Sequence, residues 1–350
     1  KYNIDNMRKI SLKGLSEIEL QNLCENLSFP KFHGTQIYEW IYKHKIDGFQ
    51  SMQNIPKKLV KLLSETYFLN SLKIKSSSKS KIDLTTKFLL ETHDNNFIET
   101  VSIIDNNRHT VCLSSQIGCN VDCDFCATGK MGIKRNLKTD EIIDQLIIIQ
   151  KETKKTVNNI VFMGMGEPFL NYANVIKACN IFSSNNAFNL GTKRITISTS
   201  GIVPKIDLFI KEKHKYKLAI SLNASNDKLR DKLIPINKKW NITSILNSLQ
   251  KYDFNETRPI MFEYVLLKDI NDSNDNAREL INLLHSFKCK INLIPFNETE
   301  GIYRRPDKNR INEFAKILND NTSNLRVLTR WSKGEDIDAA CGQLATKHEN

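Results

Sequence analysis

The chain has 350 residues, of which 40% are apolar and 26% charged, and its mean hydropathy is −0.39. This apolar content can build a sizeable core, which excludes a disordered chain, and the length fits one large domain or two to three smaller ones. Lys and Arg outnumber Asp and Glu by 51 to 39, so the formal net charge is +12. A basic surface of that size is typical of proteins that bind a polyanion such as nucleic acid. A basic enzyme without such a partner fits the charge equally well.

No apolar stretch reaches the roughly 18 residues that a membrane span needs. The most apolar run, Ile142–Ile149, is interrupted by Asp144 and Gln145, and residues 1–5 lack the apolar core of a signal peptide. Eight cysteines in a large chain without an export signal favour a reducing compartment, where cysteines serve metals or catalysis more often than disulfides. We therefore expect a cytoplasmic protein with no membrane partner.

The N-terminal quarter is the most basic part of the chain. Residues 1–90 carry 15 Lys or Arg against 8 Asp or Glu. Apolar spacing predicts helices over Leu15–Leu27, Thr35–Ile41 and Pro56–Leu69. The basic, Ser-rich stretch 73–81 predicts a linker or an exposed hairpin edge. We expect a helical, RNA-binding accessory domain over 1–75 and a strand-rich connector over 76–110.

Short strands are predicted in and just after this connector, at Lys87–Glu91, Phe97–Ile104 and Thr110–Ser114. From about residue 110 onward, strands alternate with amphipathic helices. The predicted strands are Ile160–Met163, Arg194–Ser198, Leu218–Leu222, Ile260–Leu266, Lys290–Ile294 and Arg326–Leu328. The predicted helices are Thr139–Glu152, Ala173–Asn185, Ile242–Tyr252, Asn274–Phe287 and Asp307–Asn319. Alternation of this kind predicts right-handed βαβ crossovers and an α/β fold with a parallel sheet of about six strands.

Three cysteines stand close together between a predicted strand and a helix. Cys119, Cys123 and Cys126 form the pattern C-x3-C-x2-C. A zinc site would need a fourth ligand, usually from a second closely spaced pair of Cys or His residues, and no such pair lies at the required spacing. A [4Fe–4S] cluster normally takes four cysteines, so three of them leave one iron open to bind a substrate. The spacing favours such a cluster over zinc or over buried structural cysteines.

With Phe125 just before the last cysteine, this motif resembles the signature of the radical S-adenosylmethionine (SAM) enzymes. The resemblance implies a partial (β/α)6 barrel over 111–300, and a cluster whose open iron binds SAM and cleaves it to a 5′-deoxyadenosyl radical. It also implies a set of SAM contacts. Gly166 and Glu167, in the turn Gly166-Glu167-Pro168, would hold the amino group. Strand-end residues Ser198, Ser221, Leu222 and Asn223 would contact the ribose and carboxylate, and Asn297 the adenine end.

Two further cysteines narrow the resemblance. Cys112 stands seven residues before the cluster motif, and Cys341 lies near the C-terminus among small residues. The segments around these two cysteines resemble those of RlmN-type enzymes, which methylate C2 of adenosine in RNA. They also resemble those of a sister class that methylates C8. The similarity extends from the N-terminal domain to Leu344, so residues 301–350 would form an extension that carries the methylated cysteine. The other cysteines (Cys24, Cys179 and Cys289) are expected to be buried apolar residues.

The resemblance implies a mechanism with two SAM molecules per turnover. C2 of adenine is electron-poor and cannot attack SAM directly. Cys341 would first be methylated as a thiolate. The radical from a second SAM would remove hydrogen from this methyl group, and the resulting carbon radical would add to C2. Cys112 would then resolve the protein–RNA crosslink by attacking the Cys341 sulfur to form a disulfide.

The resemblance also makes Glu99 the acceptor of the C2 proton. Without it, an exposed carboxylate on an edge strand would be the favoured interpretation. The implied partners are 23S rRNA, tRNA with an adenosine beside its anticodon, and an electron donor such as flavodoxin or ferredoxin. Two basic runs are candidates for RNA contact, one with Lys57, Lys58 and Lys61 and the other with Arg304, Arg305, Lys308 and Arg310.

Three alternatives stay open. The C8 methyltransferases share the cluster, the cysteines and the SAM motifs, and overall likeness alone favours C2. A methylthiotransferase would need three more ordered cysteines upstream, where the chain offers only Cys24 and Cys112. A non-catalytic iron–sulfur protein that binds RNA would need neither Cys112 nor Cys341.

Overall fold

The computed structural model describes residues 10–251, 259–299, 301–320 and 324–346. Residues 1–5, in which no signal peptide was recognised, lie outside these ranges. None of the described helices combines the length and the apolar character needed to cross a bilayer.

The N-terminal unit is helical, with two short parallel strands joining its ends. Its elements are β1 (Ile10–Ser11), α1 (Glu17–Asn26), α2 (Phe32–Tyr42), a 3-10 turn (Phe49–Ser51), α3 (Lys57–Thr66) and β2 (Tyr67–Phe68). Helix α1 begins at a capping box, in which the Glu19 amide donates to Ser16 Oγ and the Ser16 amide to the Glu19 carboxylate. Lys13 forms a buried ion pair with Asp144, which anchors the unit to the rest of the protein.

One curved sheet organises the remaining chain. In the described part it has ten strands in the order β14-β13-β12-β11-β10-β9-β6-β5-β4-β3. Strands β3 to β5 pair antiparallel, β5 pairs antiparallel with β6, and β6 and β9 to β14 are parallel to their neighbours. The strands are β3 (Leu72–Lys79), β4 (Leu84–Thr92), β5 (Phe97–Asp105), β6 (Arg108–Cys112), β9 (Asn159–Phe162), β10 (Ile195–Thr199), β11 (Lys217–Ser221), β12 (Ile260–Leu266), β13 (Cys289–Pro295) and β14 (Leu325–Thr329).

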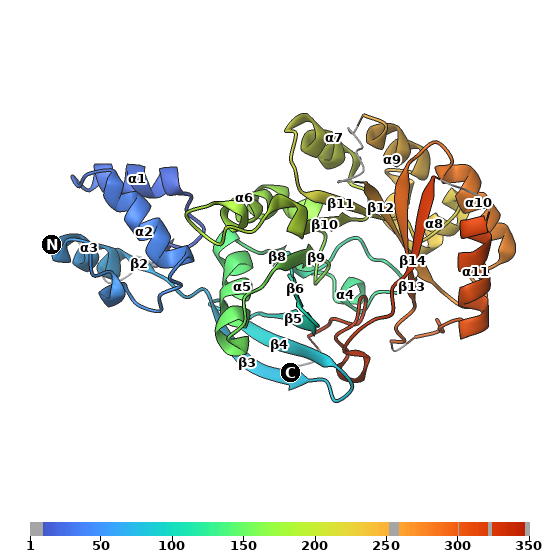
Figure 1. The fold of residues 1–350 in the computed structure, drawn as a ribbon, viewed down its shortest axis with the longest axis horizontal. Helices are drawn as coiled ribbons and strands as arrows, with labels where there is room; N and C mark the ends of the chain where they lie inside the picture. Colours follow the sequence, from blue (N-terminus) through green and yellow to red (C-terminus); the bar gives the residue numbers. More distant parts are fainter. Residues whose placement is uncertain (1–9, 252–258, 300, 321–323, 347–350) are drawn as a thin grey trace.

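The α-helices that connect the parallel strands lie outside the curved sheet (Figure 1). They are α5 (Thr139–Thr153), α6 (Tyr172–Ser183), α7 (Val203–Lys211), α8 (Asp227–Leu233), α9 (Ile242–Leu249), α10 (Asn274–Leu284) and α11 (Lys308–Asp320). A small hairpin of β7 (Gln116–Gly118) and β8 (Ile133–Asn136) encloses the short helix α4 (Ala127–Lys130). The predicted α/β class with a partial barrel is confirmed.

Two strands differ from the sequence prediction. The Ser-rich stretch forms β3, an edge strand whose positions after Leu72 are all exposed, so the hairpin-edge interpretation is the one that holds. Strand β6 pairs parallel with β9, so the parallel series begins one strand earlier than predicted. Since β3 begins at Leu72, we propose that the accessory domain ends near residue 69 rather than 75.

The C-terminal segment closes the open side of the barrel. Strands β14 and β6 are the two ends of the parallel series. Residues 330–346 leave β14 and reach the antiparallel strands, where the Gly334 amide donates to Asp83 (2.9 Å) and Ser80 donates to Asp336 (2.7 Å). This segment brings Cys341 into the barrel.

Candidate active site

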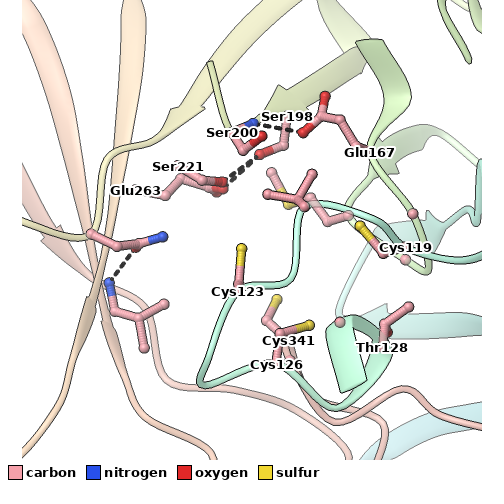
Figure 2. Close-up of a pocket in the computed structure, with 18 of the residues that line it drawn as sticks. Cys119, Cys123, Cys126, Thr128, Glu167, Ser198, Ser200, Ser221, Glu263 and Cys341 are labelled. Carbon is pink, nitrogen blue, oxygen red and sulfur yellow. Dashed lines mark hydrogen bonds between the residues drawn. The ribbon is translucent and has the colours of Figure 1, made fainter. Parts of the chain in front are cut away.

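A cavity lies at the carboxyl ends of the parallel strands, where ligands bind in folds of this kind. Cys119, Cys123 and Cys126 line it together with Glu167, Ser198, Ser221, Asn223 and Cys341. Figure 2 shows the three loop cysteines on one wall, with Cys341 beside Cys126, and the serines and Glu263 on the other. The strand order therefore gathers in one place residues that are more than 200 positions apart in the chain.

Burial of the loop that carries the three cysteines fixes its path. Val121 and Phe125 pack with Phe296 and neighbouring apolar side chains in a small cluster of their own, and the three cysteines contact it. Burying side chains of this size contributes about 1.5–3 kcal/mol each. The Cys126 amide donates to the Cys123 carbonyl (3.0 Å), and the Ala127 amide to the Gly342 carbonyl (2.8 Å). The last contact ties this loop to the C-terminal segment.

Hydrogen bonds hold both the backbone and the side chain of Glu167 in the Gly166-Glu167-Pro168 turn. The Glu167 carboxylate is 4% exposed and accepts the amides of Phe169 (2.9 Å) and Ser200 (2.7 Å). Burial raises its pKa, and these hydrogen bonds oppose the rise. A carboxylate offers about four lone-pair sites, so capacity remains for a ligand cation such as an ammonium group.

Replacing Gly166 by Ala is expected to disrupt this turn. Gly166 has φ +93°, and an added Cβ would lie 2.4 Å from the Gln116 Cβ. Gln116 also accepts the Glu167 amide (2.7 Å), so the clash would displace Glu167. We expect Gly166→Ala to weaken SAM binding at least tenfold in equilibrium dialysis. Gly191→Ala, where a Cβ meets open space, is the matched control; equal affinity in the two variants would contradict this reading.

A buried carboxylate that the sequence analysis missed connects two predicted contacts. Ser198 donates to Glu263 Oε2 (2.9 Å), and the hydroxyls of Ser198 and Ser221 lie 3.2 Å apart. Glu263 is 5% exposed, and its other oxygen, Oε1, has no partner among the described residues. Burial raises the pKa of Glu263. Glu263 could have been singled out from the sequence, because it is a lone carboxylate in the otherwise apolar run Ile260–Leu266.

The remaining predicted SAM contacts divide into two groups. Asn223 lines the cavity, with φ +56° and its side-chain oxygen accepting the Val265 amide (2.8 Å). Leu222 and Asn297 are buried and do not line it. Asn297 donates instead to the Cys341 carbonyl (3.1 Å). Its side-chain oxygen accepts a hydrogen bond from Arg305 (3.1 Å), so in this structure the Asn297 side chain is held by the C-terminal segment and by Arg305.

Cys341 and Cys112 meet at a second cavity deeper in the barrel. Both line it, and Cys341 lines the first cavity as well. All eight cysteines are free thiols. Burial raises the pKa of Cys112 to about 12 and also raises that of Cys341, while the positive charge of Arg330 opposes both shifts. Arg330, which also lines this cavity, was not singled out from the sequence.

Glu99 lies apart from both of these cavities. Its carboxylate pairs with Lys87 (3.0 Å) and accepts the Ala345 amide (3.0 Å). It lines a third cavity, beneath residues 343–346. It is 5% exposed, so the alternative of an exposed carboxylate is wrong. Burial raises its pKa, and Lys87 opposes the rise.

The two basic runs differ in how many of their side chains are free to contact RNA. Lys57, Lys58 and Lys61 are exposed on α3. In the second run, Arg305 donates to the Phe296 carbonyl (2.6 Å), and Arg310 pairs with Glu313 (3.1 Å). Much of the second run therefore holds the fold together.

Known proteins resemble the chain over most of its length. A family model described as "Radical SAM superfamily" matches residues 113–281, and "Ribosomal RNA large subunit methyltransferase N-terminal domain" matches residues 10–69. The probable dual-specificity RNA methyltransferase RlmN of Pseudothermotoga lettingae is 43% identical over 93% of this chain and 94% of its own length. The chain belongs to the RlmN family. The namesake from Alcanivorax borkumensis is 40% identical over 96% of this chain and 90% of its own.

A solved structure supports the same assignment. A radical SAM methyltransferase from Sphaerobacter thermophilus superposes with a TM-score of 0.90 at 38% identity, covering 96% of this chain and 99% of that one. The protein is thus an RlmN-type radical SAM RNA methyltransferase.

Radical SAM membership implies a [4Fe–4S] cluster and SAM, and the loop cysteines suit the cluster. Among the described residues, no three Cys, His, Asp or Glu side chains converge on a single ion. The thiols of Cys119, Cys123 and Cys126 instead share the wall of a cavity large enough for a bigger group. Burial raises the pKa of Cys119 to about 12 and raises that of Cys123. A bound metal centre reverses such shifts, because it holds the ligand thiol deprotonated.

Proposed function

We propose that this protein methylates C2 of an adenosine in 23S rRNA, and of the adenosine next to the anticodon in some tRNAs. The family-model name for residues 10–69 supports the large-subunit rRNA substrate. The words "dual-specificity RNA methyltransferase" in the names of its relatives support a second kind of RNA. The accessory domain, with its exposed lysines on α3, is proposed to hold RNA through phosphate contacts.

When bound, the cluster and two SAM molecules per turnover supply a methyl group and a carbon-centred radical. In the proposed mechanism, Cys341 accepts the methyl group on its sulfur and presents it to C2. Arg330 favours the thiolate that this alkylation needs, because its charge opposes the effect of burial on the Cys341 pKa. Cys119, Cys123 and Cys126 are the proposed cluster ligands. The proposed SAM contacts are Gly166, Glu167, Ser198, Ser221 and Asn223, which line the first cavity, together with Leu222 and Asn297, which do not line it in this structure.

Cys112 is proposed to release the product. The crosslinked adduct must first lose its unpaired electron, for which the cluster would be the acceptor, and its C2 proton. The Cys112 thiolate then attacks the Cys341 sulfur, an S–S bond forms, and the bond between that sulfur and the methylene carbon breaks, leaving its electron pair on that carbon, which takes up a proton to become the methyl group. Glu99 takes the C2 proton. A thiol reductant then restores both cysteines, and flavodoxin or ferredoxin is the proposed electron donor for the cluster.

The observation that carries this proposal is the position of Cys341. Four residues line both cavities (Met163, Ile294, Cys341 and Leu344), and Cys341 is the nucleophile among them. Its sulfur can therefore collect a group on the side of the cluster loop and pass it to a substrate on the side of Cys112.

Removing Lys87 tests the role of Glu99. A base must be deprotonated, so methylation rises with pH through the Glu99 pKa. Lys87 stabilises the carboxylate, so Lys87→Met raises this pKa further and should move the acid limb of the pH–rate profile upward by about one unit. Lys79→Met, at an exposed lysine on β3, is the control. If the limb stays in place, Glu99 is not the base that the profile reports.

The test of the function itself is anaerobic. The protein is reconstituted with iron and sulfide, given reductant, SAM and unmodified 23S rRNA, and the RNA is digested to nucleosides for mass spectrometry against methyladenosine standards. 2-Methyladenosine is the expected product. 8-Methyladenosine would assign the protein to the sister activity with the same residues, and cleavage of SAM without a methylated base would show that the substrate is wrong.

A further inference from the structure

Strand β12 carries a charged side chain into the interior of the barrel. Side chains alternate between the two faces of a strand. On β12, Met261, Glu263 and Val265 line the cavities inside the barrel, whereas Tyr264 lies on the other face and stacks on Phe314 of α11. Barrel interiors are usually filled by branched apolar side chains. A carboxylate at this position therefore calls for a functional explanation.

The Glu263 carboxylate is only half satisfied by the described residues. Ser198 donates its hydroxyl to Oε2 (2.9 Å), whereas Oε1 is buried and has no hydrogen-bond partner among those residues. An unpaired buried acceptor is costly, so native structures rarely keep one without a ligand, a water or a function to explain it. Since Glu263 lines the first cavity, Oε1 is a free acceptor on the wall of that cavity.

The hydroxyl of Ser198 narrows the kind of ligand group that this wall can take. Its proton is donated to Glu263, so Ser198 can only accept a hydrogen bond from a ligand or from the Ser221 hydroxyl, 3.2 Å away. A ligand carboxylate would meet one acceptor and one negative charge here. The wall therefore favours a ligand group that donates hydrogen bonds.

The ribose of SAM has the matching chemistry. It presents two neighbouring hydroxyls, and carboxylates accept hydrogen bonds from ribose hydroxyls in other nucleotide sites. The ammonium group of SAM is also a donor, but Glu167 offers it a second carboxylate in the same cavity. Figure 2 shows Glu167 and Glu263 on either side of Ser198. The two carboxylates can thus divide the ammonium group and the ribose between them.

We propose that Glu263 recognises the ribose of SAM, with Oε1 accepting a ribose hydroxyl and Ser198 holding the carboxylate in place. The proposal rests on the proposed function in one respect, that SAM occupies the first cavity. It gives Ser198 a positioning role through Glu263, rather than a contact with the SAM carboxylate.

Ligand analogues test this contact in the unmodified protein. Dissociation constants for S-adenosylhomocysteine and for its 2′-deoxy and 3′-deoxy analogues are measured by isothermal titration calorimetry on the anaerobically reconstituted protein, without RNA. S-Adenosylhomocysteine has no methyl group to transfer, so turnover does not enter the result. A hydrogen bond to a charged acceptor changes affinity about ten- to hundredfold, so we expect at least one deoxy analogue to bind about tenfold more weakly than the parent.

Variants then assign the discrimination to Glu263. Glu263→Met removes the acceptor at similar volume, Glu263→Gln keeps a neutral oxygen, and Glu152→Met, at an exposed glutamate on α5, is the matched control. In Glu263→Met the parent ligand should bind as weakly as the deoxy analogue, so the ratio of their dissociation constants falls to about one. Glu263→Gln should give an intermediate ratio, and Glu152→Met the wild-type ratio. A residue that only supports the fold would weaken all three ligands and leave the ratio unchanged.

Two outcomes would overturn the proposal. If wild type binds both deoxy analogues within about twofold of the parent, no ribose hydroxyl is recognised. If the ratio stays at the wild-type value in the Glu263 variants, another group makes the contact. Should Glu263→Met fail to fold, Glu263→Gln and the wild-type series still decide. Because only ligand binding is measured, a product other than 2-methyladenosine in the methylation assay rejects the proposed function without deciding this test.

Discussion

Cys341→Ala is expected to abolish methyl transfer to RNA while leaving the absorbance of the reconstituted cluster intact. The Cys341 sulfur is the proposed carrier of the methyl group, and no other nucleophile lines both cavities within the described residues. The cluster ligands lie on a separate loop held by its own apolar cluster, so removing one thiol from the C-terminal segment should not unseat it. The measurement pairs a methyl-incorporation assay with the visible spectrum of the same sample.

The control for this experiment is Cys24→Ala, at a fully buried cysteine of α1. This variant should retain methyl transfer to RNA, since the Cys24 thiol only packs against its apolar neighbours. Methylated RNA from Cys341→Ala would refute the two-cysteine mechanism. Loss of both the cluster and the activity would instead show that Cys341 is needed to hold the cluster.

Arg230→Met is expected to lower the free energy of unfolding by about 3–5 kcal/mol, because it leaves several buried carbonyl oxygens without a donor, at about 1–3 kcal/mol each. Arg230 is fully buried and donates to the carbonyls of Ser200, Leu222 (3.0 Å) and Ser221 (3.1 Å). These carbonyls belong to the turns that follow β10 and β11. Burial lowers the pKa of the guanidinium to about 10, so it stays charged at neutral pH.

Urea unfolding of the protein, with SAM affinity measured in parallel, checks this expectation. Arg278→Met, at an arginine 65% exposed on α10 and paired with Asp275, should cost less than about 1 kcal/mol. An Arg230→Met protein that unfolds within 1 kcal/mol of wild type would show that the three carbonyls find other donors.

The chemistry-bearing motifs were predictable where residues are close in sequence. The three loop cysteines and the Gly166-Glu167-Pro168 turn lie on one cavity, because short spacing constrains where side chains can reach. Asn297 was matched by its place after a strand, but the strand-end position alone did not determine which partner its side chain takes. The sequence could place a residue at the correct edge of the sheet without specifying its contact.

The missed residues share a different property. Glu263, Arg230 and Arg330 are single charges without a spacing pattern, and a strand or helix sequence does not say which charge lies inside. Lys217 and Lys290 stand at or next to the start of a predicted strand, and nothing in their local sequence shows that both line the second cavity. Only the parallel order of β11, β12 and β13 turns them toward one cavity. Tertiary topology, rather than local pattern, brings these two charges together.

The position of Cys341 between two cavities has a kinetic consequence. In the proposed mechanism the methyl donor reaches this sulfur from the cavity of the cluster loop and the nucleotide from the cavity of Cys112, so neither has to leave for the other to arrive. Spent donor fragments can depart past the cluster loop while RNA remains engaged. Steady-state inhibition by S-adenosylhomocysteine should accordingly be non-competitive toward RNA, because the inhibitor and the RNA would occupy different cavities.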